Sequence, residues 1–217
     1  MRGRVPSRLC AICDAEACAR AGWLPEHAAR AFLEGGARFI QLRAKRLSSG
    51  DFLRLIDAVM GVAEPLGASV VVNDRVDLAR LGAATGVHVG QDDISPRVAR
   101  ELLGAKAIVG LSTHTTAQLE TARSEPVSYV AVGPVFGTAT KDTGYEAVGL
   151  AAIAVARRIL PDGIPVLAIG GITIERAADA LAAGASAVAV ISDLLSAGDP
   201  ADRVRAYLKR LGTVSKV

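Results

Sequence analysis

Short apolar runs alternate with amphipathic segments along the whole of this 217-residue chain. The runs are four to seven residues long, as buried strands are, and helical spacing of apolar residues follows each. We expect strands at residues 9–13, 37–43, 69–72, 86–89, 107–111, 128–132, 165–169 and 186–190. We expect helices at residues 26–34, 49–64 and 76–81, and from about residues 95, 115, 149, 173 and 199.

Strands that alternate with helices predict a parallel sheet with right-handed crossovers. Eight units fit a single (β/α)8 TIM barrel, although the chain is short for that fold, and a doubly wound open sheet is the alternative. We expect one domain over residues 1–217, with loosely ordered tails at residues 1–7 and 212–217. Ligands bind at the carboxyl ends of the strands in both architectures, so functional residues should follow the strands.

Charge and hydropathy exclude several classes of function. The formal net charge is +3 and no block of like charge occurs, which disfavours nucleic-acid binding. No apolar stretch approaches the roughly 20 residues that a membrane span needs. The basic start of the chain is not followed by the long apolar core of a secretory signal. We therefore expect a cytoplasmic protein.

Cys10, Cys13 and Cys18 lie close together near the start of the chain. Cys10 and Cys13 have the spacing of half a zinc site or of a redox pair. No second cysteine pair and no nearby histidine completes a zinc site, and Cys10 lies in a predicted strand. We interpret the cysteines as structural or incidental.

The second predicted strand ends in the sequence Gln41-Leu42-Arg43-Ala44-Lys45. Because side chains alternate along a strand, Gln41, Arg43 and Lys45 share a face, which we expect to point into the barrel. Two cations there are costly unless they meet an anion. A diphosphate is the natural partner, because arginine binds it with two donors and lysine adds a point charge. A frayed strand end with solvated cations is the alternative.

Acidic residues follow the next two predicted strands. The third strand ends at Asn73-Asp74, and Asp92-Asp93 come shortly after the fourth. Neighbouring strand ends lie about 5 Å apart, so carboxylates from both can share one Mg²⁺ with substrate phosphates and water. Helix capping and turn formation are the alternative roles of these residues.

Groups suited to a second anion follow the later strands. The loop after the sixth strand carries Thr138, Thr140 and Lys141 within four residues. Gly170 and Gly171 precede a helix, where backbone N–H groups often bind phosphate in barrels. These features indicate two anionic substrates joined between two sites, with diphosphate as the leaving group.

Ser112 is a small hydrogen-bond donor after the fifth predicted strand. We interpret His88 as a core histidine rather than a catalytic base, and place His114 near a helix start. The sequence shows neither an evident Ser–His–Asp arrangement nor a G-x-S-x-G motif, which disfavours nucleophilic hydrolysis.

Five motifs carry a resemblance to a known family: Gln41-Leu42-Arg43-Ala44-Lys45, Asn73-Asp74-Arg75, His88-Val89-Gly90-Gln91-Asp92-Asp93, Gly133-Pro134-Val135-Phe136 with Thr138-Ala139-Thr140-Lys141, and Ile169-Gly170-Gly171-Ile172. Together they resemble thiamine-phosphate synthase, also called thiamine-phosphate pyrophosphorylase, from about the first strand to the eighth. The resemblance implies a transferase of thiamine biosynthesis. It would couple hydroxymethylpyrimidine diphosphate to a thiazole phosphate and release thiamine phosphate and diphosphate.

The resemblance also implies roles for individual residues. Catalytic roles would belong to Arg43, Lys45, Ser112 and Lys141, and Mg²⁺ would be held by Asp74 and Asp93 rather than Asp92. The pyrimidine diphosphate would be bound by Gln41, Leu42, Arg43, Ala44, Lys45, Asn73, Ser112 and Lys141. The thiazole phosphate would be bound by Thr138, Ala139, Thr140, Gly171, Ile191 and Ser192. Gly137 stands where many relatives have proline. Glycine at this position loosens the loop.

The implied mechanism is dissociative, with diphosphate leaving before the thiazole nitrogen attacks the pyrimidine methylene cation. The sequence agrees, because it carries many anion-binding groups and no evident nucleophile. A related thiazole tautomerase is the nearest rival, and a non-catalytic barrel that binds a phosphorylated ligand is a rival of another class. The full set of cations and carboxylates favours the synthase. A homodimer is also implied by the resemblance.

Overall fold

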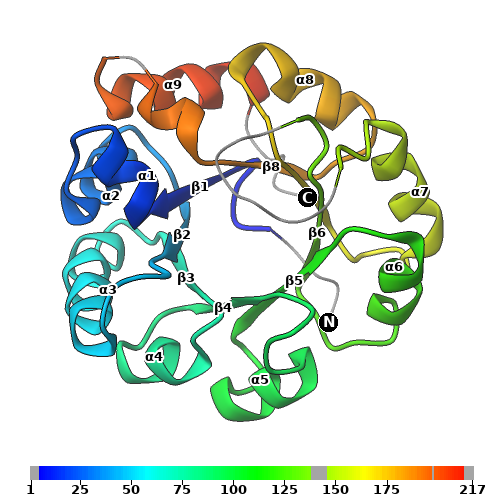
Figure 1. Cartoon of the computed structure of the whole chain (residues 1–217), viewed down its shortest axis with the longest axis horizontal. Helices are drawn as coiled ribbons and strands as arrows, with labels where there is room; N and C mark the ends of the chain where they lie inside the picture. Colours follow the sequence, from blue (N-terminus) through cyan, green and yellow to red (C-terminus); the bar gives the residue numbers. More distant parts are fainter. Residues whose placement is uncertain (1–4, 138–145, 197, 213–217) are drawn as a thin grey trace.

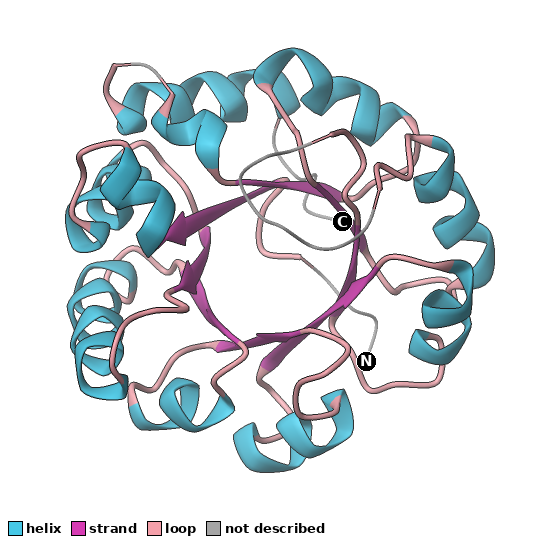
Figure 2. Cartoon of the chain, in the orientation of Figure 1, coloured by secondary structure: helices cyan, strands magenta, loops and turns pink. Residues whose placement is uncertain are grey.

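The computed structural model describes residues 5–137, 146–196 and 198–212. Its strands form a closed parallel barrel in which each strand pairs with the next and β1 pairs with β8. The helices form an outer ring around the strands (Figures 1 and 2). The predicted (β/α)8 TIM barrel is confirmed, and the open-sheet alternative is wrong.

The strands are β1 (Leu9–Asp14), β2 (Phe39–Arg43), β3 (Ser69–Asn73), β4 (Gly86–Val89), β5 (Ile108–Thr113), β6 (Tyr129–Val132), β7 (Val166–Ile169) and β8 (Ala187–Val190). The helices are α1 (Ala15–Arg20), α2 (Pro25–Glu34), α3 (Ser49–Ala63), α4 (Val76–Leu81), α5 (Pro96–Leu103), α6 (Thr116–Ala122), α7 (Ala151–Ile159), α8 (Ile174–Ala182) and α9 (Pro200–Leu211), with a 3-10 helix, η1 (Ser192–Leu195). Within the described ranges, no helix is both long and apolar enough to cross a membrane.

The sequence did not predict α1 or η1. Both are short, and α1 has only six residues, too few for a clear helical period. The side chain of Asp14 caps α1 by accepting a hydrogen bond from the backbone N–H of Ala17. A polar cap directly after a strand is the signal that marks this helix.

The strands bury both of their faces. One cluster of side chains fills the barrel interior: Val5, Cys10, Ile12, Phe39, Val71, Tyr129, Ala131, Leu167, Ala187 and Ala189. Alternate residues of the same strands, such as Ala11 and Ile40, belong to the outer cluster, which packs against the helices. The alternation inferred for β2 is therefore confirmed at Phe39, Ile40 and Leu42.

Val5 belongs to the interior cluster, although it lies in a segment that we expected to be a loosely ordered tail. It is only 6% exposed. Residues 1–4 and 213–217 lie outside the described part of the chain, so the remainder of that expectation stays a prediction.

The three cysteines are free and buried. Cys10 lies in the interior cluster and Cys13 in the outer one, so the spacing of a half-site in the sequence does not bring the two thiols together. Cys13 instead lies beside Cys18, with 3.9 Å between the sulfur atoms, and donates a hydrogen bond to the carbonyl of Pro25. These contacts tie β1 to α1 and to the first residue of α2.

The barrel closes where the beginning and the end of the chain meet. β1 pairs with β8, and α2 packs on α9. A Cβ atom on Gly35, just after α2, would lie 2.5 Å from the carbonyl oxygen of Ala201 in α9. Arg8 adds a hydrogen bond of 2.7 Å to the carbonyl of Leu211. Glycine at position 35 thus permits the close approach that seals this joint.

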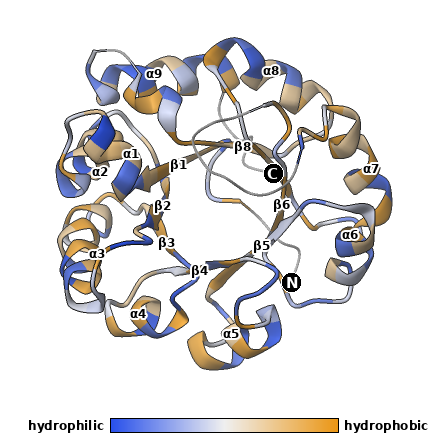
Figure 3. Ribbon diagram, viewed as in Figure 1, coloured by the Kyte–Doolittle hydropathy of each residue, from blue (hydrophilic) through white to orange (hydrophobic). Residues whose placement is uncertain are grey.

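Apolar side chains are exposed on the two helices that follow β3 and β4. Leu81 of α4 is 70% exposed, and Val98 and Leu102 of α5 are 41% and 43% exposed. Hydrophobic colour is prominent on these helices in Figure 3. The groove between α4 and α5 is consequently more apolar than its charged mouth at the carboxyl ends of the strands.

Gly110→Ala is expected to destabilise the fold by about 2 kcal/mol, because overpacking a filled interior forces neighbours to move. A Cβ atom on Gly110 would collide with the ring of Tyr129 and lie 2.5 Å from Nδ1 of His88. Urea unfolding measures the loss. Gly61→Ala is the matched control, because nothing lies within 4 Å of its Cβ position in α3. That control should be neutral or more stable by about 0.5 kcal/mol, and equal effects at the two sites would contradict the packing argument.

Candidate active site

Buried polar side chains gather toward the carboxyl ends of β1 to β5. The five described residues of this kind are Asp14, Gln41, Asn73, His88 and Thr113. Each is at most 6% exposed. Burying such groups costs free energy unless each finds a partner. Their position at this edge of the barrel agrees with the expectation that functional residues follow the strands.

Arg43 ends β2 and pairs in register with Asp14 at the end of β1. Its Nη1 donates to Oδ2 of Asp14, and Oε2 of Glu16 lies 3.8 Å from the same nitrogen. Nε of Arg43 and Oε2 of Glu16 have no hydrogen-bond partner among the described residues. Arg43 is therefore positioned by carboxylates and retains an unused buried donor.

Sequence reasoning identified Arg43 but missed the carboxylates that hold it. Asp14 was placed just beyond the end of the first strand, and Glu16 was not considered for the site. The available signal was the position of Asp14 at the end of β1, the strand next to β2, which carries Arg43.

Leu42 and Ala44 were expected to bind substrate, but their side chains belong to the outer core. They are 0% and 9% exposed, on the face that meets the helices. A contact between either residue and a ligand inside the barrel mouth must therefore use the backbone.

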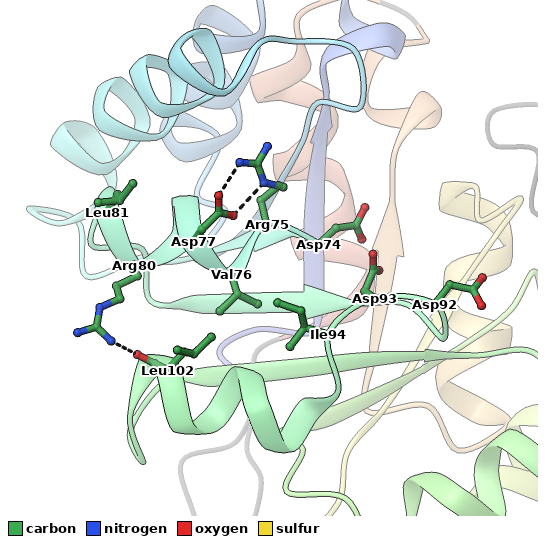
Figure 4. Close-up of a pocket in the computed structure, with 10 residues that line it drawn as sticks. All are labelled: Asp74, Arg75, Val76, Asp77, Arg80, Leu81, Asp92, Asp93, Ile94 and Leu102. Carbon is green, nitrogen blue, oxygen red and sulfur yellow. Dashed lines mark hydrogen bonds and ion pairs between the residues drawn. The ribbon is translucent and has the colours of Figure 1, made fainter.

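Asp74 follows β3 in a left-handed conformation, with φ of 62°. Aspartate tolerates this region better than most residues. Nζ of Lys45 forms an ion pair with Oδ2 of Asp74. Figure 4 shows the carboxylates of Asp74 and Asp93 directed toward one another, whereas Asp92 points away. The structure thus brings together both aspartates that were expected to bind metal.

Asp93 also shapes its own loop, because its Oδ2 accepts a hydrogen bond of 2.7 Å from the backbone N–H of Gly90. Asp74 and Asp93 lie at one end of a pocket of about 760 Å³ between α4 and α5. The other lining residues are Arg75, Val76, Asp77, Arg80, Leu81, Asp92, Ile94 and Leu102.

The environment of Asp74 disfavours its ionised form. Burial raises the pKa of Asp74, the neighbouring Asp93 raises it further, and Lys45 opposes both effects. A divalent cation between the two carboxylates would remove this cost. Among the residues described, no group of three or more metal-ligating side chains forms. A pair of aspartates that leaves other positions to phosphate oxygens and water fits Mg²⁺.

Asp74→Asn is expected to raise the melting temperature of the metal-free protein at pH 7. Folding raises the pKa of this carboxyl, so the wild type loses stability as the pH rises from the unfolded pKa through the folded one. As the pH falls below about 4 the carboxyl becomes protonated in both the folded and the unfolded chain, and the difference should shrink toward zero. Loss of the ion pair to Lys45 costs little, because that lysine side chain is 52% exposed.

Thermal unfolding in chelator between pH 3.5 and 8 makes this measurement. Asp77→Asn is the matched control in the same pocket, because a hydrogen bond from Arg75 lowers the pKa of Asp77. That variant should show the opposite sign at pH 7. Destabilisation by Asp74→Asn at pH 7 would contradict the account of its environment.

Ser112 lies beside His88, with 2.8 Å between its Oγ and Nε2 of the histidine. Nδ1 of His88 lies 2.8 Å from the hydroxyl oxygen of Tyr129. The interpretation of His88 as a buried histidine with hydrogen-bond partners is confirmed. His114 lies elsewhere, with Nδ1 2.5 Å from the carbonyl oxygen of Gly133.

The loops after β6 and β7 approach each other closely. A Cβ atom on Gly171 would lie 2.6 Å from the carbonyl oxygen of Gly137 and 2.8 Å from Cβ of Phe136. Gly171 also has φ of 60°, which favours glycine. Glycine at position 171 thus permits the two loops to approach, and its contact with the thiazole phosphate stays a prediction.

Ile191 and Ser192 follow β8 at the start of η1. Arg203 of α9 holds this short helix through two-pronged contacts with Asp193, of which the shortest is 2.8 Å. The hydroxyl of Tyr207 also donates to Asp193. Thr138, Ala139, Thr140 and Lys141 lie outside the described residues. Their roles, and the assignments to Ile191 and Ser192, stay predictions.

A closed barrel with cations, carboxylates and amides at the carboxyl ends of its strands has the form of a (β/α)8-barrel enzyme. The model of a family described as thiamine monophosphate synthase matches residues 9–194. The chain belongs to the thiamine monophosphate synthase family.

Individual relatives agree with this assignment. The chain is 42% identical over 176 residues to the thiamine-phosphate synthase of Roseiflexus sp. (strain RS-1), covering 81% of this chain and 74% of the relative. It is 39% identical over 208 residues to that of Chlorobium phaeovibrioides (strain DSM 265 / 1930), covering 95% and 96%. A solved thiamine phosphate pyrophosphorylase from Pyrococcus furiosus is 28% identical, with a TM-score of 0.82 over 94% of this chain and 95% of that one. The resemblance seen in the motifs is confirmed.

Proposed function

We propose that this chain couples hydroxymethylpyrimidine diphosphate to a thiazole phosphate and releases thiamine phosphate and diphosphate. Membership of the family supports the reaction. The observation within the structure that carries the proposal is the pairing of cations with carboxylates at the ends of β1 to β3. Such a set is arranged before substrate arrives and can exchange internal partners for phosphate oxygens.

Arg43 and Lys45 are the residues that we assign to the diphosphate. Arg43 is held by Asp14, and its Nε has no hydrogen-bond partner in the part of the chain that the structure describes. Lys45 reaches Asp74 from a half-exposed position, so its ammonium can turn toward a phosphate oxygen. Both residues stabilise negative charge that increases on the leaving group, which lowers the barrier to departure.

We propose that Asp74 and Asp93 hold Mg²⁺ beside that diphosphate. Their facing carboxylates and the raised pKa of Asp74 support this assignment. When bound, Mg²⁺ supplies a Lewis acid that neutralises charge on phosphate oxygens. Lys45, whose ammonium pairs with Asp74 in the structure, would then be available to the substrate.

The proposed chemistry is a dissociative substitution at the methylene carbon of the pyrimidine. The bond from that carbon to the diphosphate oxygen breaks with both electrons on oxygen, and the ring amino group stabilises the cation that remains. The thiazole nitrogen then donates its electron pair to the methylene carbon. The protein needs no covalent nucleophile for this route, because positioning and charge stabilisation suffice.

The test is turnover by the purified chain. We expect release of diphosphate and formation of thiamine phosphate in equal amounts when both substrates and Mg²⁺ are present. Omission of the thiazole phosphate and addition of excess chelator are the controls, and each should abolish product formation.

Two outcomes would contradict the proposal. Isomerisation of a thiazole precursor without any condensation would favour the tautomerase reading. Tight binding of the pyrimidine diphosphate with no turnover would favour a non-catalytic binding barrel. A homodimer and a cytoplasmic location stay predictions, which sedimentation and cell fractionation measure.

A further inference from the structure

A line of hydrogen-bonding side chains crosses the barrel interior toward Ser112. His88 contacts Ser112 through Nε2 and Tyr129 through Nδ1, each at 2.8 Å. The side chain of Gln41 lies near enough to Tyr129 to lower the pKa of the phenol, against the effect of burial. His88 is 6% exposed, Tyr129 1% and Gln41 5%, so bulk water does not compete for these groups.

Gly110 makes this line possible. His88 in β4 and Tyr129 in β6 both lie in register with Gly110 in β5, the strand between them. Their rings stack across the glycine, with centroids 5.5 Å apart and an interplanar angle of 22°. Because a Cβ atom at position 110 would occupy the space of the phenol, any other residue would break the contact.

The partners set the direction of each hydrogen bond. Burial raises the pKa of Tyr129 well above the ordinary value of tyrosine, and the side chain of Gln41 opposes this effect, as a hydrogen-bond donor to the phenol oxygen would. The phenol therefore keeps its proton and is available as a donor to Nδ1 of His88. A neutral imidazole that accepts at Nδ1 carries its proton on Nε2 and donates to Oγ of Ser112.

We infer that Gln41, Tyr129 and His88 are positioning residues that orient the hydroxyl hydrogen of Ser112 toward the bound substrate. Because Oγ of Ser112 accepts from His88, its own hydrogen points elsewhere and is a donor for an anionic oxygen. The inference rests on the proposed function, in which Ser112 contacts the pyrimidine diphosphate. It assigns Tyr129 and His88 a role that the sequence motifs did not.

The tautomer of His88 tests the direction of the line without any need for turnover. In ¹⁵N spectra of the substrate-free protein, we expect Nε2 of His88 to be protonated and Nδ1 to accept a hydrogen bond, with the signals assigned by comparison with His88→Gln. In Tyr129→Phe, which keeps the ring but removes the donor, the two tautomers should mix. A protonated Nδ1 in the wild type would overturn the inference.

The effect on catalysis is measured with Tyr129→Phe, Ser112→Ala and the double variant. Tyr129→Phe should lower kcat about tenfold with little change in KM, as expected for one hydrogen bond to a charged group. In the Ser112→Ala background the same change should have almost no further effect, because its influence passes through Ser112. Additive losses would mean that Tyr129 acts only on the fold, and they would overturn the inference.

Binding of inorganic diphosphate with Mg²⁺ separates this inference from the proposed reaction. Tyr129→Phe should weaken diphosphate binding several-fold. In the Ser112→Ala background, the same substitution should leave diphosphate binding unchanged. If the wild type shows no turnover, the proposed reaction fails while the tautomer and binding results still decide the role of the line. If Tyr129→Phe bound diphosphate with the affinity of the wild type, the positioning role of Tyr129 would be contradicted.

Discussion

Asp93→Asn is expected to lower kcat for diphosphate release about 100-fold at saturating Mg²⁺, the scale of losing one charge-stabilising group. The carboxylate of Asp93 faces that of Asp74 across the proposed metal position (Figure 4). Asparagine can still accept the hydrogen bond from Gly90, so the loop after β4 should keep its conformation. Initial rates of diphosphate release across a range of Mg²⁺ concentrations measure the effect.

Asp92→Asn is the matched control for this experiment. It makes the same change one residue earlier, where the carboxylate points away from Asp74. It should retain most of the activity and the same dependence on Mg²⁺. Equal losses in the two variants, or an unchanged Mg²⁺ dependence in Asp93→Asn, would contradict the assignment of the metal to Asp93.

Arg43→Met is expected to destabilise the fold by about 3 kcal/mol and to lower kcat by about 100-fold. The loss of stability follows because Asp14, which is 2% exposed, is left as a buried charge without its guanidinium. The loss of activity follows from the missing contact with the diphosphate. Urea unfolding and diphosphate release measure the two effects separately.

The double variant Arg43→Met/Asp14→Asn separates stability from catalysis. Neutral asparagine removes the unpaired charge, and its side-chain oxygen can still cap α1 through the N–H of Ala17. We expect most of the stability to return while activity remains low. Recovery of activity together with stability would show that Arg43 acts through the fold alone.

Much of the fold follows from local patterns in the sequence. Strand-length apolar runs alternate with segments of helical period. A parallel sheet covered by helices buries both the apolar strands and the apolar faces of the helices. The period of two along β2 likewise placed Gln41 and Arg43 inside the barrel, because a strand can present only alternate residues to one face. The short helices α1 and η1 carry too few residues for their period to be recognised.

The contacts inside the site depend on register between strands, which a local pattern does not contain. Arg43 meets Asp14 because these residues are opposite each other in β1 and β2. Tyr129 meets His88 because a glycine occupies the same level of the strand between them. Barrel closure sets this stagger through all the strands at once. The motifs could therefore identify Asp74 and Asp93 as site residues. They could not show that Asp14 holds Arg43 or that Tyr129 contacts His88.

The joint between β1 and β8 also sets the point in synthesis at which the barrel can close. The ribosome delivers β1 to β4, with most of the charged groups proposed to bind diphosphate, long before β8 and α9 exist. Until those last elements emerge, β1 has an unpaired edge and the surface under Gly35 lacks its cover. The nascent chain thus carries an exposed sheet edge until β8 emerges and pairs with β1, and α9 then covers the surface at Gly35.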